Sequence, residues 1–92
     1  MIKPCVLVFA GLDPSGGAGM QADIEAIAAM GAHALPIITT LTVQDNDRVF
    51  AIQPVDAALL RQQSAALLGK LQIAAVKIGI VGSRDNVAVI AD

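Results

Sequence analysis

The chain has 92 residues, a formal net charge of −2, 55% hydrophobic residues and 15% charged residues. This length allows one domain at most, and the scattered basic residues with only two phenylalanines argue against a nucleic-acid-binding protein. No apolar run reaches the length of about 18 residues that a membrane span needs, and the single cysteine favours a reducing, cytoplasmic environment.

Short apolar runs alternate with helical patterns along the sequence. We expect strands at residues 5–10, 35–41, 49–52 and 74–81, helices at 18–30 and 56–68, and a polar loop at 44–48. Asp56 is placed to cap the second helix and Gly69 to end it. Unbroken apolar strands are typical of parallel sheets that are covered on both faces. The pattern therefore predicts an α/β fold built from βαβ units.

The most informative segment is the glycine-rich turn that joins the first strand to the first helix. Such a turn brings backbone N–H groups close to a ligand at the carboxyl end of the strand. A Walker A loop is excluded, because Gly16 is followed by Gly17 and Ala18 rather than by lysine and a hydroxyl residue. A dinucleotide fingerprint fits from Gly17 to Ala22, but it begins too far after the strand. The turn therefore predicts a small-molecule site.

Asp23 occupies an unusual position in the first helix. On a helical wheel it falls inside the apolar stripe, which consists of Met20, Ile24, Ile27 and Met30. An ionised carboxylate that faces a sheet is costly unless it is hydrogen-bonded or paired. It could accept hydrogen bonds from the glycine loop, or it could contact a polar ligand. We favour the ligand, because a solvated helix position was available and was not used.

Four other features suggest structural roles. Asp13 precedes Pro14, and we expect its side chain to bond the backbone of its own loop. Lys77 lies in an apolar strand, which favours an ion pair or an extended stem over phosphate binding. A lone His33 makes no metal site. The second helix should pack into the core through its leucine face, which consists of Leu59, Leu60 and Leu67.

The run from Gly11 to Asp23, Gly-Leu-Asp-Pro-Ser-Gly-Gly-Ala-Gly-Met-Gln-Ala-Asp, resembles the opening motif of hydroxymethylpyrimidine/phosphomethylpyrimidine kinases. These thiamine-biosynthesis enzymes belong to the ribokinase-like superfamily. The resemblance to this family continues in the same order at residues 38–44, at the helix around Gln62 and at residues 76–79. It therefore covers nearly the whole chain. It implies a three-layer α/β/α fold with a mainly parallel sheet. We expect residues 1–92 to be the N-terminal portion of one such domain, since the composition is too apolar for a small free-standing one.

The resemblance also implies a reaction. These enzymes use ATP and Mg²⁺ to phosphorylate 4-amino-5-hydroxymethyl-2-methylpyrimidine, and then phosphorylate the monophosphate. Matching positions imply that Gly11, Asp23 and Gln44 line the pyrimidine pocket and that Ile80, where the family usually has methionine, covers the ring. Residue 45 is Asp where the family commonly has Asn. The catalytic base, the nucleotide site and any metal ligands belong to the C-terminal half of the family, so none is assigned to these residues.

Several alternatives stay open at this point. A pyridoxal-type vitamin kinase would share the fold, a non-catalytic module could hold a pyrimidine without turnover, and an NAD-binding domain is less favoured. In every case the expected partner is a small molecule rather than nucleic acid or a membrane. A homodimer is an open alternative to a monomer.

Overall fold

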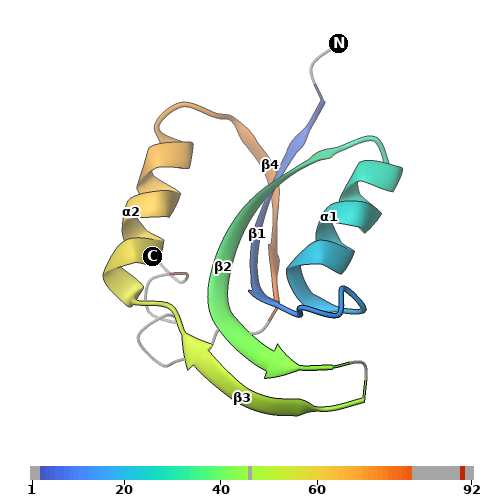
Figure 1. The fold of residues 1–92 in the computed structure, drawn as a ribbon. Coiled ribbons are helices and arrows are strands. Elements are labelled where there is room, and N and C mark those ends of the chain that lie inside the picture. The colour runs from blue at the N-terminus through green and yellow to red at the C-terminus, as the bar shows by residue number, and fades with distance from the viewer. Residues whose placement is uncertain (1–2, 46, 80–89, 91–92) are drawn as a thin grey trace.

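The computed structural model describes residues 3–45, 47–79 and 90, and within them it shows a sheet with a helix on each face (Figure 1). The elements in chain order are β1 (Cys5–Leu12), α1 (Gly19–Ala29), β2 (His33–Gln44), β3 (Val49–Pro54), α2 (Ala57–Leu68) and β4 (Ile73–Ile78). The strands lie in the order β3-β2-β1-β4. β1 pairs in parallel with β2 and β4, whereas β3 runs antiparallel to β2. The predicted α/β class with a mainly parallel sheet is confirmed.

The core lies on both faces of β1, which explains why this strand is an unbroken apolar run. On one face, Leu60 of α2 packs with residues of β1 and β2, namely Leu7, Phe9, Leu35 and Ile37. On the other face, Met20 of α1 packs with Val8, Ala10 and Ala34. Alternate residues of β1 therefore serve two separate clusters, as the two-residue period of a strand requires. The result is three layers, with α1 and α2 on opposite sides of the sheet (Figure 1).

Two strands extend further than their apolar runs. β1 continues through Gly11 and Leu12, and β2 continues to Gln44, which the sequence placed in a loop. The antiparallel partner β3 explains the second extension, because Thr42 pairs with Ile52 and Gln44 pairs with Val49. The polar residues at the end of β2 are thus held in a hairpin. Gln44 gains a fixed backbone position as a result.

Burial differs from expectation at the edge of the sheet. We expected the last strand to be buried on both faces, yet the side chains of β4 after Ile73 are exposed, with Val76 and Ile78 each 54% accessible. Among the described strands β4 lies at the end of the order β3-β2-β1-β4, and α1 and α2 pack over β1 and β2. Leu59 is also 45% exposed, so only Leu60 and Leu67 of the predicted leucine face pack inward.

Both helix predictions hold in position but not in every detail. Asp56 is the N-cap residue of α2 and Gly69 its C-cap, but the Asp56 side chain makes no capping hydrogen bond and Gly69 has an ordinary φ of −73°. The apolar stripe of α1 is narrower than predicted, because Met30 is 86% exposed. Within the described residues, no helix has the length and apolar character that crossing a membrane requires.

Candidate functional site

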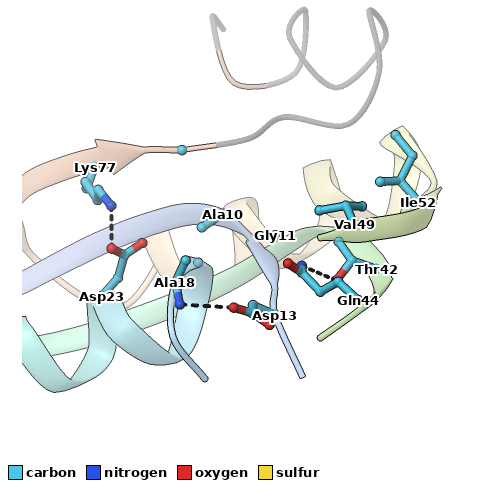
Figure 2. Close-up of a pocket in the computed structure, with 12 residues that line it drawn as sticks. Ala10, Gly11, Asp13, Ala18, Asp23, Thr42, Gln44, Val49, Ile52 and Lys77 are labelled. Carbon is cyan, nitrogen blue, oxygen red and sulfur yellow. Dashed lines mark hydrogen bonds and ion pairs between the residues drawn. The ribbon is translucent and has the colours of Figure 1, made fainter. Parts of the chain in front are cut away.

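A cavity of about 230 Å³ lies at the carboxyl ends of β1 and β4, beside the β2–β3 hairpin (Figure 2). Its lining consists of Ala10, Gly11, Asp13, Ala18, Gly19, Asp23, Thr42, Gln44, Val49, Ile52, Lys77 and Gly79. Ligands of open α/β sheets bind at this edge. The structure places Gly11, Asp23 and Gln44, which the family resemblance had grouped, in the lining of one cavity. Ile80 lies outside the described residues.

The strands lose their regular pairing where the cavity begins. The register shifts between Ala10 and Gly11 in β1, and between Val43 and Gln44 in β2. Such irregularities redirect side chains and are frequent beside functional sites. Here they accompany two of the residues that the sequence selected for ligand contact.

Asp13 organises the glycine loop. Its buried carboxylate accepts hydrogen bonds from the backbone N–H of Ser15 at 2.8 Å, the hydroxyl of Ser15 at 2.7 Å and the backbone N–H of Ala18 at 3.1 Å. The hydrogen bond from the Ser15 hydroxyl, together with those from backbone N–H groups, holds the pKa of Asp13 below its ordinary value. The predicted loop-bonding role of Asp13 is confirmed.

Glycine is required where the loop meets the helix. Gly19 has a φ of +65°, and a Cβ atom at this position would lie 2.5 Å from the carbonyl oxygen of Gly11. An isolated bridge joins Leu12 to Gly19 at the same point. This close approach lets α1 begin directly against the end of β1. It thereby places the first turns of α1 at the cavity.

Asp23 does not serve the glycine loop, so the alternative that it bonds the loop N–H groups is wrong. Its Oδ1 forms an ion pair with Nζ of Lys77, which lies 54 residues later on β4 (Figure 2). The ion pair predicted for Lys77 is thus confirmed. The Asp23 side chain is only 12% exposed, and its Oδ2 is buried with no hydrogen-bond partner among the described residues. An acceptor left in this state typically costs about 1–3 kcal/mol.

Gln44 is held by a chain of hydrogen bonds that we did not predict from the sequence. Gln44 Nε2 donates to Thr42 Oγ1 at 2.5 Å, and the Thr42 hydroxyl donates to the carbonyl oxygen of Leu12 at 2.8 Å. The two-residue period of a strand was an available signal, because it puts Thr42 and Gln44 on the same face of β2. The chain links the hairpin to the end of β1.

Apolar walls complete the cavity. Val49 and Ile52 of β3 line it, whereas the family resemblance implied Ile80, which lies outside the described residues. Gly79 itself donates its N–H to the carbonyl of Phe9 at 2.7 Å, and a Cβ there would touch Ala10. The cavity therefore combines apolar walls with acceptor oxygens on Asp23 and Gln44. Within residues 3–45, 47–79 and 90, no group of three or more His, Cys, Asp or Glu side chains could hold a metal ion.

A glycine loop that opens a helix beside a cavity at the carboxyl edge of a mainly parallel sheet places this chain in the ribokinase-like class of α/β folds. The family model "Phosphomethylpyrimidine kinase" matches residues 13–92. The chain belongs to the phosphomethylpyrimidine kinase family.

Individual relatives agree with this assignment. The chain is 41% identical over 86 residues to the hydroxymethylpyrimidine/phosphomethylpyrimidine kinase of Rhizobium meliloti, a match that covers 94% of this chain and 32% of the relative. The crystal structure of phosphomethylpyrimidine kinase from Clostridium difficile is 36% identical with a TM-score of 0.89, and the match covers 96% of this chain and 38% of that one. Bacillus subtilis pyridoxal kinase in its ADP complex is 26% identical with a TM-score of 0.87, over 97% and 35% of the two chains. The chain thus spans about a third of the length of each of these three proteins.

Proposed function

We propose that the protein carrying this chain phosphorylates 4-amino-5-hydroxymethyl-2-methylpyrimidine and its monophosphate, and that the cavity holds the pyrimidine. One observation carries the proposal. Gly11, Asp23 and Gln44 come from three separate elements and were selected from the sequence by family resemblance, and they line the same cavity. Relatives at 41% and 37% identity are kinases named for this substrate.

The chemistry of the lining suits an aminopyrimidine. The exocyclic amino group and the hydroxymethyl group carry hydrogen-bond donors, and the buried Asp23 Oδ2 and the Gln44 amide offer acceptors. Val49 and Ile52 provide apolar contact for the ring. Binding sites for small molecules commonly combine apolar walls with a few polar groups that fix orientation.

The proposal includes ATP as phosphoryl donor, Mg²⁺ and a cytoplasmic location. Phosphoryl transfer depends on positioning and on electrostatic stabilisation of the transferred group. The described residues contribute the positioning of the acceptor substrate, since Asp23 and Gln44 would hold the pyrimidine while its hydroxymethyl group is phosphorylated. ADP and AMP-PCP complexes of related pyridoxal kinases support a nucleotide substrate.

The test uses the complete protein encoded by the gene that carries this sequence. Isothermal titration calorimetry would measure the affinity of wild type and Gln44→Ala for the pyrimidine and, separately, for ATP. We expect Gln44→Ala to weaken pyrimidine binding about tenfold or more, because the loss of one hydrogen bond in a desolvated site lowers the affinity by about this factor. We expect ATP binding to stay unchanged. Equal loss of both affinities would contradict the assignment of the cavity.

A second candidate function is supported by the structural likeness to Bacillus subtilis pyridoxal kinase. Its sequence identity of 26% is lower than the 36% of the phosphomethylpyrimidine kinase structure, so we rank it second. ATP-dependent phosphorylation of pyridoxal and of the aminopyrimidine, measured side by side, separates the two kinases. Tight pyrimidine binding without turnover would instead identify a non-catalytic module.

A further inference from the structure

We propose that Thr42 is a positioning residue that fixes the amide of Gln44 with Oε1 toward the cavity, so that the site accepts a hydrogen bond from an amino group. The assignment of Thr42 concerns the protein alone. Its consequence for ligand selection rests on the proposed function.

The direction of the hydrogen-bond chain follows from elementary chemistry. The carbonyl oxygen of Leu12 can only accept, so the Thr42 hydroxyl must use its single hydrogen to donate to it at 2.8 Å. Thr42 Oγ1 then has only lone pairs to offer Gln44, whose amide approaches to 2.5 Å. The amide must therefore present Nε2 to Thr42. Rotation of the amide by 180° would bring two acceptor oxygens together and lose the hydrogen bond.

The residues that anchor this series of hydrogen bonds belong to the sheet. Leu12 ends β1 and pairs with Leu41 of β2, and Thr42 pairs with Ile52 of β3. Thr42 and Leu12 are 30 residues apart in sequence, so their hydrogen bond reports a defined tertiary contact. Since both ends are held by strand pairing, the position of the Thr42 hydroxyl is set before any ligand arrives. Rigid support of this kind is what a specific contact requires.

The fixed amide determines what the cavity can recognise. Figure 2 shows Gln44 Oε1 on the side of its amide away from Thr42, and no hydrogen bond to this oxygen comes from the described residues. It presents an acceptor in addition to the buried Oδ2 of Asp23. A pyrimidine with an amino group can donate to Gln44 Oε1. The 4-oxo analogue would place carbonyl lone pairs there, and sites built for a hydrogen bond reject such analogues strongly.

The selectivity experiment compares Thr42→Val with Thr42→Ser in the complete protein. Valine removes the hydroxyl at nearly constant size, and serine keeps the hydroxyl as the matched control. Calorimetry would measure the affinities for 4-amino-5-hydroxymethyl-2-methylpyrimidine and for its 4-oxo analogue. We expect wild type and Thr42→Ser to prefer the amino compound by similar ratios, and Thr42→Val to lower that ratio about tenfold. An unchanged ratio in Thr42→Val would overturn the proposal.

A measurement without ligand separates this proposal from the proposed function. The side-chain amide signals of Gln44, identified in NMR spectra by their loss in Gln44→Glu, should be shifted and protected from exchange in wild type and Thr42→Ser. In Thr42→Val they should move toward random-coil values. Random-coil signals in wild type would overturn the proposal even if Thr42→Val failed to fold. Protected signals in a protein that binds no aminopyrimidine would support the role of Thr42 and contradict the proposed function.

Discussion

The glycine loop and the face of α1 each place one carboxylate at the cavity, and the two differ in how they are satisfied. Asp13 accepts three hydrogen bonds from Ser15 and Ala18. Asp23 has one ion-pair partner, and its second oxygen is buried without any partner among the described residues. A carboxylate satisfied by its own loop maintains structure. One with a buried, unpartnered oxygen beside a cavity is not satisfied by the described part of the fold.

The largest expected effect concerns the stability of the loop. Replacing Asp13 by alanine removes the acceptor of three hydrogen bonds, so it should lower the midpoint of thermal unfolding of the complete protein by about 5 °C. Asp13→Asn, which keeps one acceptor oxygen, should lose less. Calorimetric scans of the three proteins check this order. A melting temperature unchanged in Asp13→Ala would show that the loop does not depend on this carboxylate.

Asp23→Ala should give the opposite pattern. We expect the affinity for the aminopyrimidine to fall about tenfold or more, because a charged acceptor is lost, whereas the melting temperature should change by less than about 2 °C. Calorimetric titration and thermal unfolding of the same samples measure both quantities. A lower melting temperature with unchanged affinity would make Asp23 a structural residue like Asp13.

The pH dependence of stability gives a second test of the structural role of Asp13. Its pKa is lowered in the folded protein from the ordinary value of 3.8, so the folded state favours the ionised form. The resulting stabilisation is present above the unfolded-state pKa and is lost as pH falls through the folded-state pKa. Melting temperatures between about pH 5 and pH 2 should therefore fall less steeply in Asp13→Asn than in wild type.

Asp45→Asn is a suitable control for that measurement. The pKa of Asp45 is also lowered, by hydrogen bonds from the backbone N–H groups of Asp47 and Arg48, but Asp45 is exposed. Solvent screens such an exposed charge. Asp45→Asn should therefore reduce the fall in melting temperature at acidic pH less than Asp13→Asn does. If both variants followed the wild-type curve, the two carboxylates would not contribute to acid lability.

The smallest effect on pyrimidine affinity is expected at Lys77. Its side chain is 51% exposed, but its partner Asp23 is only 12% exposed, so removing the ammonium leaves a largely buried carboxylate without its ion-pair partner. Lys77→Met should therefore lower the melting temperature by about 2–4 °C and weaken pyrimidine binding about threefold, because Asp23 loses a partner that orients it. Lys77→Arg retains the charge and should bind nearly as wild type. A loss in Lys77→Met as large as that in Asp23→Ala would mean that Lys77 itself contacts the ligand.

Local patterns in the sequence predicted much of the fold. The apolar run of β1 and the helical period of α1 reflect contacts that repeat along each element, so they are visible in composition and spacing. The exposure of β4 among the described residues depends on which elements cover it in three dimensions, and a pattern along one strand does not record that. The same holds for Leu59, whose apolar character does not reveal that α2 faces the sheet through Leu60.

In the candidate site, too, local patterns predicted some residues, whereas others depend on the tertiary arrangement. The loop-bonding role of Asp13 follows from turn chemistry, and family resemblance placed Gly11, Asp23 and Gln44 together. The pairing of Asp23 with Lys77 joins α1 to β4 across 54 residues, and only the strand order reveals which lysine is near. Thr42 was missed because its importance arises from the β2–β3 hairpin and from a backbone carbonyl of β1. The two-residue period of a strand puts Thr42 on the same face as Gln44, but neither tertiary contact leaves a motif in the sequence.

The central claim is that this cavity is the binding site for the aminopyrimidine. A crystal structure of the complete protein with 4-amino-5-hydroxymethyl-2-methylpyrimidine tests it most directly. We expect the pyrimidine between the glycine loop and the β2–β3 hairpin, with its amino group on Gln44 Oε1 and a donor on Asp23 Oδ2. A pyrimidine bound elsewhere, or bound here without contact to either Asp23 or Gln44, would contradict it.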